Sequence, residues 1–161
     1  MKTGFPARGI ISCRNTLTEA LQDYVDFLVN PAMKQHKSYI KDTKHALQLM
    51  EKANEEGLVT DNINLVTADF ENMYGKMPLD LSKKGVLASY CDVDSDLKPY
   101  QNELLEALDI CQDNNVFEFA NKLYKQKQGH GTGQKQVPPV ACAGAAVAEQ
   151  EWMEIDGVKE L

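Results

Sequence analysis

Residues 140–154 read VACAGAAVAEQEWME and contain the longest apolar stretch of the 161-residue chain, from Val140 to Ala148. The pattern predicts a helix built from small side chains. Because Ala, Gly and Cys let another backbone approach closely, such a helix needs a flat partner to cover it. The apolar stretch falls far short of the roughly 20 residues that span a membrane.

The segments before this helix alternate between helical and extended patterns. VFEFANKLYKQKQ (116–128) predicts a β-hairpin, because apolar and charged residues alternate and Asn121 lies near the turn. Apolar residues at helical spacing predict helices within 16–33, 42–55, 82–90 and 99–112, and short strands are predicted at RGIIS (8–12) and NLVTADF (64–70). We therefore expect one domain over residues 1–161 with an α/β (α+β) fold, helix-rich with a small, mostly antiparallel sheet.

Charge and cysteine content narrow the functional classes. The chain carries 17 basic and 24 acidic residues, a formal net charge of -7, so its averaged field repels a nucleic acid and any such contact must be local. Pro6 and Arg8 interrupt the apolar core that a signal peptide needs. The four cysteines lack CxxC or CxxH spacing, which argues against a zinc site. We expect an intracellular protein, nuclear or cytoplasmic, with reduced cysteines and no membrane contact.

A single aspartate at the end of a predicted strand is the first candidate for chemistry. In TADFENMYGKMP (67–78), Asp69 follows the apolar run NLV directly. A strand end is a common place for a carboxylate that holds a divalent cation, because Mg²⁺ prefers oxygen ligands. The alternative is that Asp69 only caps the turn that follows the strand.

Three further segments leave two interpretations open. The glycines of QGHGTGQKQVPP (128–139) permit close approach of a phosphate or a base, or they form a flexible surface loop. Lys37, Lys41 and Lys44 could hold phosphates, or they form a solvated helix face. DVDSDLKPYQNE (92–103) matches the acidic positions of an EF-hand loop, but Leu97 replaces the required glycine, which favours a solvated acidic loop.

Taken in order, four segments resemble the reverse transcriptase of Penelope-like retroelements, in its fingers and the first part of its palm. RGIISCRNTLTEALQDYVDFLVNP (8–31) is similar to the arginine-bearing fingers segment, and SYIKDTKHAL (38–47) to a lysine-aspartate-threonine stretch. LVTADFENMYGKMP (65–78) resembles the first palm motif. NNVFEFANKLYKQKQGHGTGQKQVPPVACA (114–143) resembles the strand, glutamine-glycine turn and helix of the second. The resemblance therefore spans nearly the whole chain.

The resemblance implies specific roles around the first palm motif. The aspartate that matches Asp69 binds the catalytic Mg²⁺ in such polymerases, so Asp69 becomes the expected catalytic and metal-binding residue. Phe70 would offer its backbone carbonyl nearby. Tyr74 would pack under the sugar of the incoming nucleotide and exclude a 2′-hydroxyl. Positioning and charge neutralisation are the main needs of phosphoryl transfer, so these roles are chemically coherent.

The remaining implied residues bind other parts of the nucleotide. Arg8 matches the fingers arginine that contacts the triphosphate. Gln128 and Gly129 match the turn beside the nascent base pair. A reverse transcriptase completes its metal site with a paired-aspartate hairpin, whereas this chain ends at EQEWMEIDGVKEL without the third palm motif. We expect a reverse-transcriptase-like domain derived from a Penelope-like retroelement that cannot polymerise on its own, with its status as an enzyme left open.

The alternative is a domesticated, non-catalytic module that binds nucleic acid or protein. Under either interpretation two surfaces lack the rest of a palm to cover them. These are the strand near Val66, whose unpaired edge invites strand addition, and the small-residue helix from Val140 to Trp152. A homodimer through one of them is therefore predicted, because two-fold pairing is the commonest way to cover such a surface.

Overall fold

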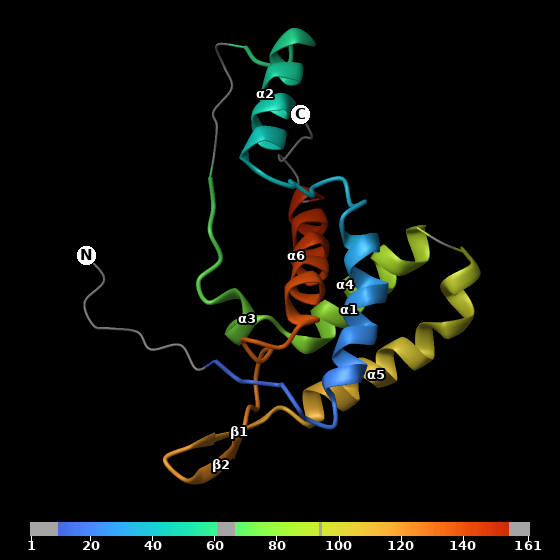
Figure 1. Ribbon diagram of the computed structural model, residues 1–161. Coiled ribbons are helices and arrows are strands. Elements are labelled where there is room, and N and C mark those ends of the chain that lie inside the picture. Colours follow the sequence, from blue (N-terminus) through green and yellow to red (C-terminus); the bar gives the residue numbers. More distant parts are fainter. Residues whose placement is uncertain (1–9, 61–66, 94, 155–161) are drawn as a thin grey trace.

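The computed structural model describes residues 10–60, 67–93 and 95–154, and for residues 90–93 and 95–97 it describes the backbone only (Figure 1). Within these ranges the chain is helix-rich, with six α-helices, one 3-10 helix and one two-stranded antiparallel sheet. The elements in order are α1 (Glu19–Met33), α2 (Thr43–Glu55), α3 (Met73–Lys76), α4 (Leu79–Val93), η1 (Ser95–Tyr100), α5 (Gln101–Asp113), β1 (Val116–Phe119), β2 (Lys122–Lys125) and α6 (Val137–Met153). None of the described helices is long and apolar enough to cross a membrane.

Helix α6 is the central element of the helical body. It contacts α1, α3 and α4, and nine of its residues between Val137 and Val147 are buried (Figure 1). Two prolines occupy its first turn, where their missing N–H groups would have no helical acceptor. A Cβ atom at Gly85 of α4 would overlap the carbonyl group of Ala143, so the two helices touch backbone to backbone. The small residues of α6 therefore admit α4 at close range.

The hydrophobic core is formed where α1, α4, α5 and α6 meet. Helices α1, α5 and α6 each contribute residues three or four positions apart, which lie on one face of a helix, and α4 contributes Val86. Burying these side chains is the main favourable contribution to folding. The buried core residues are Val25, Val29, Met33, Val86, Leu104, Ala107, Leu108, Val140, Ala143 and Ala146.

The structure confirms the predicted hairpin and the coarse positions of the five longer helices. Strand β1 pairs with β2 from Val116 opposite Lys125 to Phe119 opposite Lys122. Asp42 caps α2, because its carboxylate accepts a hydrogen bond from the backbone N–H of His45 at 2.8 Å. Pro31 lies inside the last turn of α1, which ends two residues later at Met33. In place of the predicted acidic loop, η1 follows α4 and leads directly into α5.

Two predicted strands are wrong in the part of the chain that is described. Thr67–Phe70 have no regular structure and are exposed, and residues 64–66 lie outside the described ranges. Residues 10–12 of the predicted RGIIS strand are also irregular, although the N–H of Ile11 donates to the carbonyl of Thr132 at 2.7 Å. A strand needs a hydrogen-bonding neighbour, and the described residues place none beside 67–70.

The small-residue part of the expected dimer surface on α6 is covered within one chain, whereas Trp152 at its end is 59% exposed. Ala145, at its centre, is only 6% exposed, because α1, α3 and α4 already cover this helix within one chain. The flat partner that the small residues require is therefore α4 and its Gly85. The other expected surface, around Val66, lies outside the described residues, and dimerisation itself stays a prediction.

Candidate nucleic-acid interface

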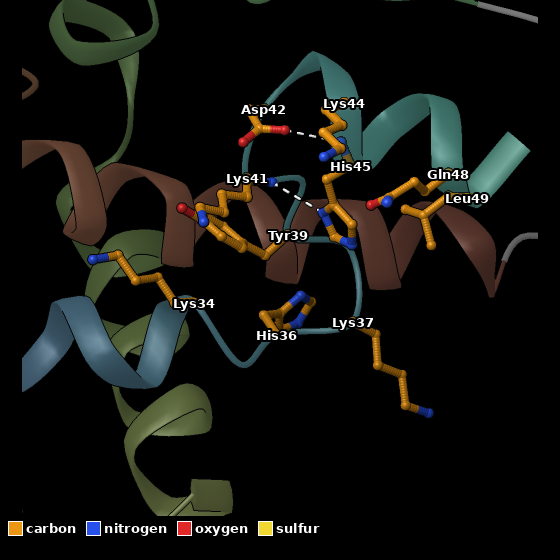
Figure 2. A pocket seen from close by; sticks show the side chains of 10 residues that line it. All are labelled: Lys34, His36, Lys37, Tyr39, Lys41, Asp42, Lys44, His45, Gln48 and Leu49. Atoms are coloured by element: carbon orange, nitrogen blue, oxygen red, sulfur yellow. Dashed lines mark hydrogen bonds between the residues drawn. The ribbon is translucent and has the colours of Figure 1, made fainter.

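A basic hollow lies between the end of α1 and the first half of α2 (Figure 2). It is open to solvent and has a volume of about 730 Å³. The side chains that line it come from the connection 34–42 and from the first two turns of α2, and they are Lys34, His36, Lys37, Tyr39, Lys41, Asp42, Lys44, His45, Gln48 and Leu49. We call this set the basic hollow.

Charge distinguishes the basic hollow from the rest of the molecule. Four of its side chains are lysines and one is a carboxylate, whereas the whole chain has a formal net charge of -7. The six ion pairs found among the described residues use other lysines, so Lys34, Lys37, Lys41 and Lys44 have no carboxylate partner there. The carboxylate of Asp42 is already engaged as the cap of α2. The hollow therefore presents a net positive charge to solvent.

Local hydrogen bonds hold the connection between the two helices. Beyond α1, the N–H groups of Gln35, His36 and Tyr39 donate to the carbonyls of Ala32, Met33 and His36 at 3.0 to 3.1 Å. These turns carry Tyr39 into the hollow, where it lies at the middle of the residues drawn in Figure 2. Its ring is partly exposed, so it offers an apolar surface among the lysines.

Both histidines of the hollow are fixed through the same ring nitrogen. The backbone N–H of Lys41 donates to Nδ1 of His45 at 3.2 Å, and that of Ser38 donates to Nδ1 of His36 at 3.3 Å. Each Nδ1 is therefore an acceptor, which places the proton of the neutral ring on Nε2. The hydroxyl of Ser38 also lies 2.9 Å from Nδ1 of His36. The two Nε2–H groups add donors to the lysine ammonium groups.

Helix α2, which forms one wall of the hollow, is separate from the helical body. It has no buried residue and contacts none of the other described helices or strands. Its large apolar side chains are exposed, with Leu47, Leu49 and Met50 at 54%, 43% and 52%. Since its N-terminus points into the connection, the positive end of the helix dipole adds to the field of the lysines.

The structure describes Asp69, Phe70 and Tyr74, the three residues implied by the first palm motif. Asp69 and Phe70 lie in irregular, exposed backbone, with the Phe70 side chain 49% exposed. The described side chains include no group of three His, Cys, Asp or Glu that could hold a metal ion, so Asp69 has no such set around it. Arg8 lies outside the described residues. Magnesium binding at Asp69 stays a prediction of the resemblance.

Tyr74 and Gly129, which are 55 positions apart in sequence, lie together. Gly129 has a left-handed φ of +68°, and a Cβ atom there would overlap the carbonyl of Gly75 and lie 2.5 Å from the carbonyl oxygen of Tyr74. The carbonyl of Gly129 accepts a hydrogen bond from Nε2 of Gln112 at 2.7 Å. Gln128 is exposed, and its carbonyl accepts from Nε2 of Gln126 at 2.8 Å. Glycine is therefore required here by contacts within the protein.

His130, beside this glycine, joins the glycine-rich loop to α3 and α4. Its backbone N–H donates to the carbonyl of Tyr74 at 2.6 Å, and its carbonyl accepts from Nε2 of Gln126 at 2.9 Å. Its Nε2 lies 2.8 Å from the hydroxyl of Ser82 in α4. The side chain is 4% exposed, and burial lowers its pKa from 6.5 to about 4. At neutral pH the ring is an uncharged structural link that fixes the glycine-rich loop on α3 and α4.

Of the described cysteines, Cys111 is buried, whereas Cys13 is half-buried and Cys142 is exposed. Cys13, Cys111 and Cys142 are free thiols. Cys111 is 1% exposed in the core, and burial raises its pKa to about 11. A thiol with so high a pKa is a poor nucleophile at neutral pH.

Sequence reasoning identified Lys37, Lys41 and Lys44 but not the other members of the hollow. Lys34, Tyr39 and both histidines were missed. The available signal is the run KQHKSYIKDTKH (34–45), in which four lysines and two histidines accompany one aspartate. Comparison with protein-family models, with curated proteins and with solved structures finds no match to the chain.

Proposed function

We propose that this chain is a non-polymerising, reverse-transcriptase-like domain that binds nucleic acid through the basic hollow. The origin rests on the resemblance of four ordered segments to the reverse transcriptase of Penelope-like retroelements. The function rests on one observation, which is the gathering around a hollow of four lysines that have no ion pair with the described residues, on a chain of net charge -7. Lysines that contact phosphates release condensed counterions, which drives association.

In the described part of the chain, no observation supports polymerase chemistry as strongly as the lysines of the basic hollow support binding. Asp69 is exposed in irregular backbone, and the described part of the chain brings no set of metal ligands to it. Two-metal catalysis requires several carboxylates that clamp two ions a few ångströms apart. Binding, in contrast, needs only positive charge at a surface that a phosphate backbone can reach.

The number of lysines sets the expected salt dependence. For a single strand, log K falls with log salt by about 0.7 per neutralised phosphate, so four lysines predict a slope of about -3. The acidic residues elsewhere on the chain oppose association, and salt screens their repulsion over a Debye length of about 10 Å at 0.1 M. Affinity should therefore depend on the hollow itself.

The experiment replaces Lys37 and Lys41 with glutamine and measures binding of labelled oligonucleotides by fluorescence anisotropy at several salt concentrations. The expected result is a loss of affinity and a slope reduced to about -1.4, because two phosphate contacts remain. Lys52→Gln is the matched control, since Lys52 lies on α2 and pairs with Glu56 at 3.6 Å.

Two results would contradict the proposal. One is a wild-type chain that binds neither single strands nor duplexes at low salt. The other is a double variant that binds with the affinity and slope of the wild type, which would place any nucleic-acid contact elsewhere. Circular dichroism of each variant checks that α2 is retained.

A further inference from the structure

The β1–β2 hairpin projects from the helical body at the end of the molecule opposite α2 (Figure 1). Its strands are largely exposed, with Phe117 alone partly buried. Ala120 and Asn121, the two turn residues, have φ values of 50° and 59°, which is the geometry of a tight two-residue hairpin turn. The turn fixes the register and so decides which side chains share a face.

The two faces of this hairpin differ in chemistry. Phe117, Phe119, Lys122 and Tyr124 share one face by the observed register, and we call it the aromatic face. The opposite face carries Val116, Glu118, Leu123 and Lys125. Lys125 pairs with Asp113 at 3.2 Å, whereas Lys122 has no ion pair among the described residues. The aromatic face thus combines three rings and one free cation with no carboxylate.

One ring on this face has no structural explanation in the described part of the chain. Phe117 and Tyr124 stack on each other, with ring centroids 5.6 Å apart and planes 20° apart, which stabilises an otherwise marginal two-stranded hairpin. Phe119 lies outside this stacked pair and is 69% exposed. A phenylalanine this exposed next to a free lysine has the chemistry of a binding surface.

We propose that the aromatic face binds the bases of a single-stranded nucleic acid. The proposal deepens the proposed function, because it names the form of nucleic acid and a second contact with it. Exposed rings stack on unpaired bases, and Lys122 lies beside Phe119 where it can contact a phosphate. The segment 116–127 carries three lysines and one glutamate, so its charge also complements a polyanion. A duplex keeps its base faces stacked inside and offers them to no ring.

The test compares Phe119→Ala with Leu123→Ala in the full chain. Leu123 is the matched control, because it lies on the opposite face of the same hairpin and is 76% exposed. The probes are a labelled oligothymidylate of about 16 nucleotides, close to the largest site of one single-strand-binding fold, and a duplex of equal length. Phe119→Ala should weaken binding of the single strand about tenfold, with Leu123→Ala and duplex binding unchanged.

The salt slope separates this inference from the proposed function. Phe119→Ala should leave the slope unchanged, since a ring releases no counterions. Equal affinities of Phe119→Ala and Leu123→Ala would overturn the inference even where the lysine variants lose binding. A wild type that binds neither probe would overturn both proposals. Sedimentation gives the remaining outcome, because a mass that falls from two chains to one in Phe119→Ala would assign the face to protein association instead.

Discussion

Lowering the pH from 7 to 5 should destabilise the folded chain through His130. Burial lowers the pKa of this ring from 6.5 to about 4, and its Nε2 already lies 2.8 Å from the hydroxyl of Ser82. Between pH 6.5 and pH 4 the unfolded chain binds a proton at this histidine and the folded chain does not. Above pH 6.5 the neutral ring does not reduce the free energy of unfolding. As the pH falls below 6.5 the free energy of unfolding decreases, and the decrease is nearly complete near pH 4.

The size of the effect follows from the two pKa values. Each pKa unit corresponds to 1.36 kcal/mol, so the full shift is worth about 3 kcal/mol, and the part lost between pH 6.5 and pH 5 is about 2 kcal/mol. This is a large share of the 5 to 15 kcal/mol that typically separates folded from unfolded states. Carboxylates titrate mainly below pH 5, so the chosen interval mainly reports on histidines.

Urea unfolding at pH 7 and pH 5 measures the effect in the wild type, in His130→Gln and in His36→Gln. Glutamine keeps a polar group near Ser82 but removes the titration. We expect His130→Gln to lose about 2 kcal/mol less than the wild type over this interval, and His36→Gln to behave as the wild type. Equal losses in all three proteins would show that burial of His130 does not produce the pH dependence.

Two substitutions test the packing. Gly129→Ala should lower the free energy of unfolding in urea by at least about 3 kcal/mol, because left-handed strain adds to the overlap with the α3 carbonyls. Gly57→Ala, at a φ of +71° with open space around it, should lower it by about 1 kcal/mol. Similar losses in the two variants would refute the contact. Ala145→Arg should unfold the chain, because it buries a charge in the core, whereas Gln150→Arg at an exposed position should not. Circular dichroism measures the outcome. A folded Ala145→Arg whose light-scattering mass halves would instead restore the dimer interface on α6.

Features encoded by neighbouring residues were predictable from the sequence. The start of α2 and the turn of the hairpin depend on residues a few positions apart, and both lie where the sequence predicts them. The strand at 64–70 could not be judged in this way, because its existence depends on a partner strand elsewhere in the chain. Tyr74 and Gly129 were each named through the resemblance, but their contact across α3 and the glycine-rich loop depends on tertiary packing.

The basic hollow also could not be predicted from the sequence alone. Its lysines are adjacent in sequence, yet a charged run usually lies on an ordinary solvated face. What makes it a candidate site is the turn after α1, which brings Lys34 and Tyr39 against the first turns of α2. That geometry depends on where α1 ends, and periodicity locates helix ends poorly.

The isolation of α2 would couple the proposed binding of a polyanion to folding. Its thirteen residues contact no other described element, and isolated helices shorter than about 12 to 15 residues are marginal in water. Such a helix opens locally at a free-energy cost well below that of global unfolding, while α6 opens only with the whole core. A polyanion that bridges Lys34 and Lys44 would bind only molecules in which α2 is folded, and it would therefore shift the local folding equilibrium toward the folded helix. The observed association constant of the polyanion would then equal the intrinsic constant multiplied by the fraction of molecules in which α2 is folded.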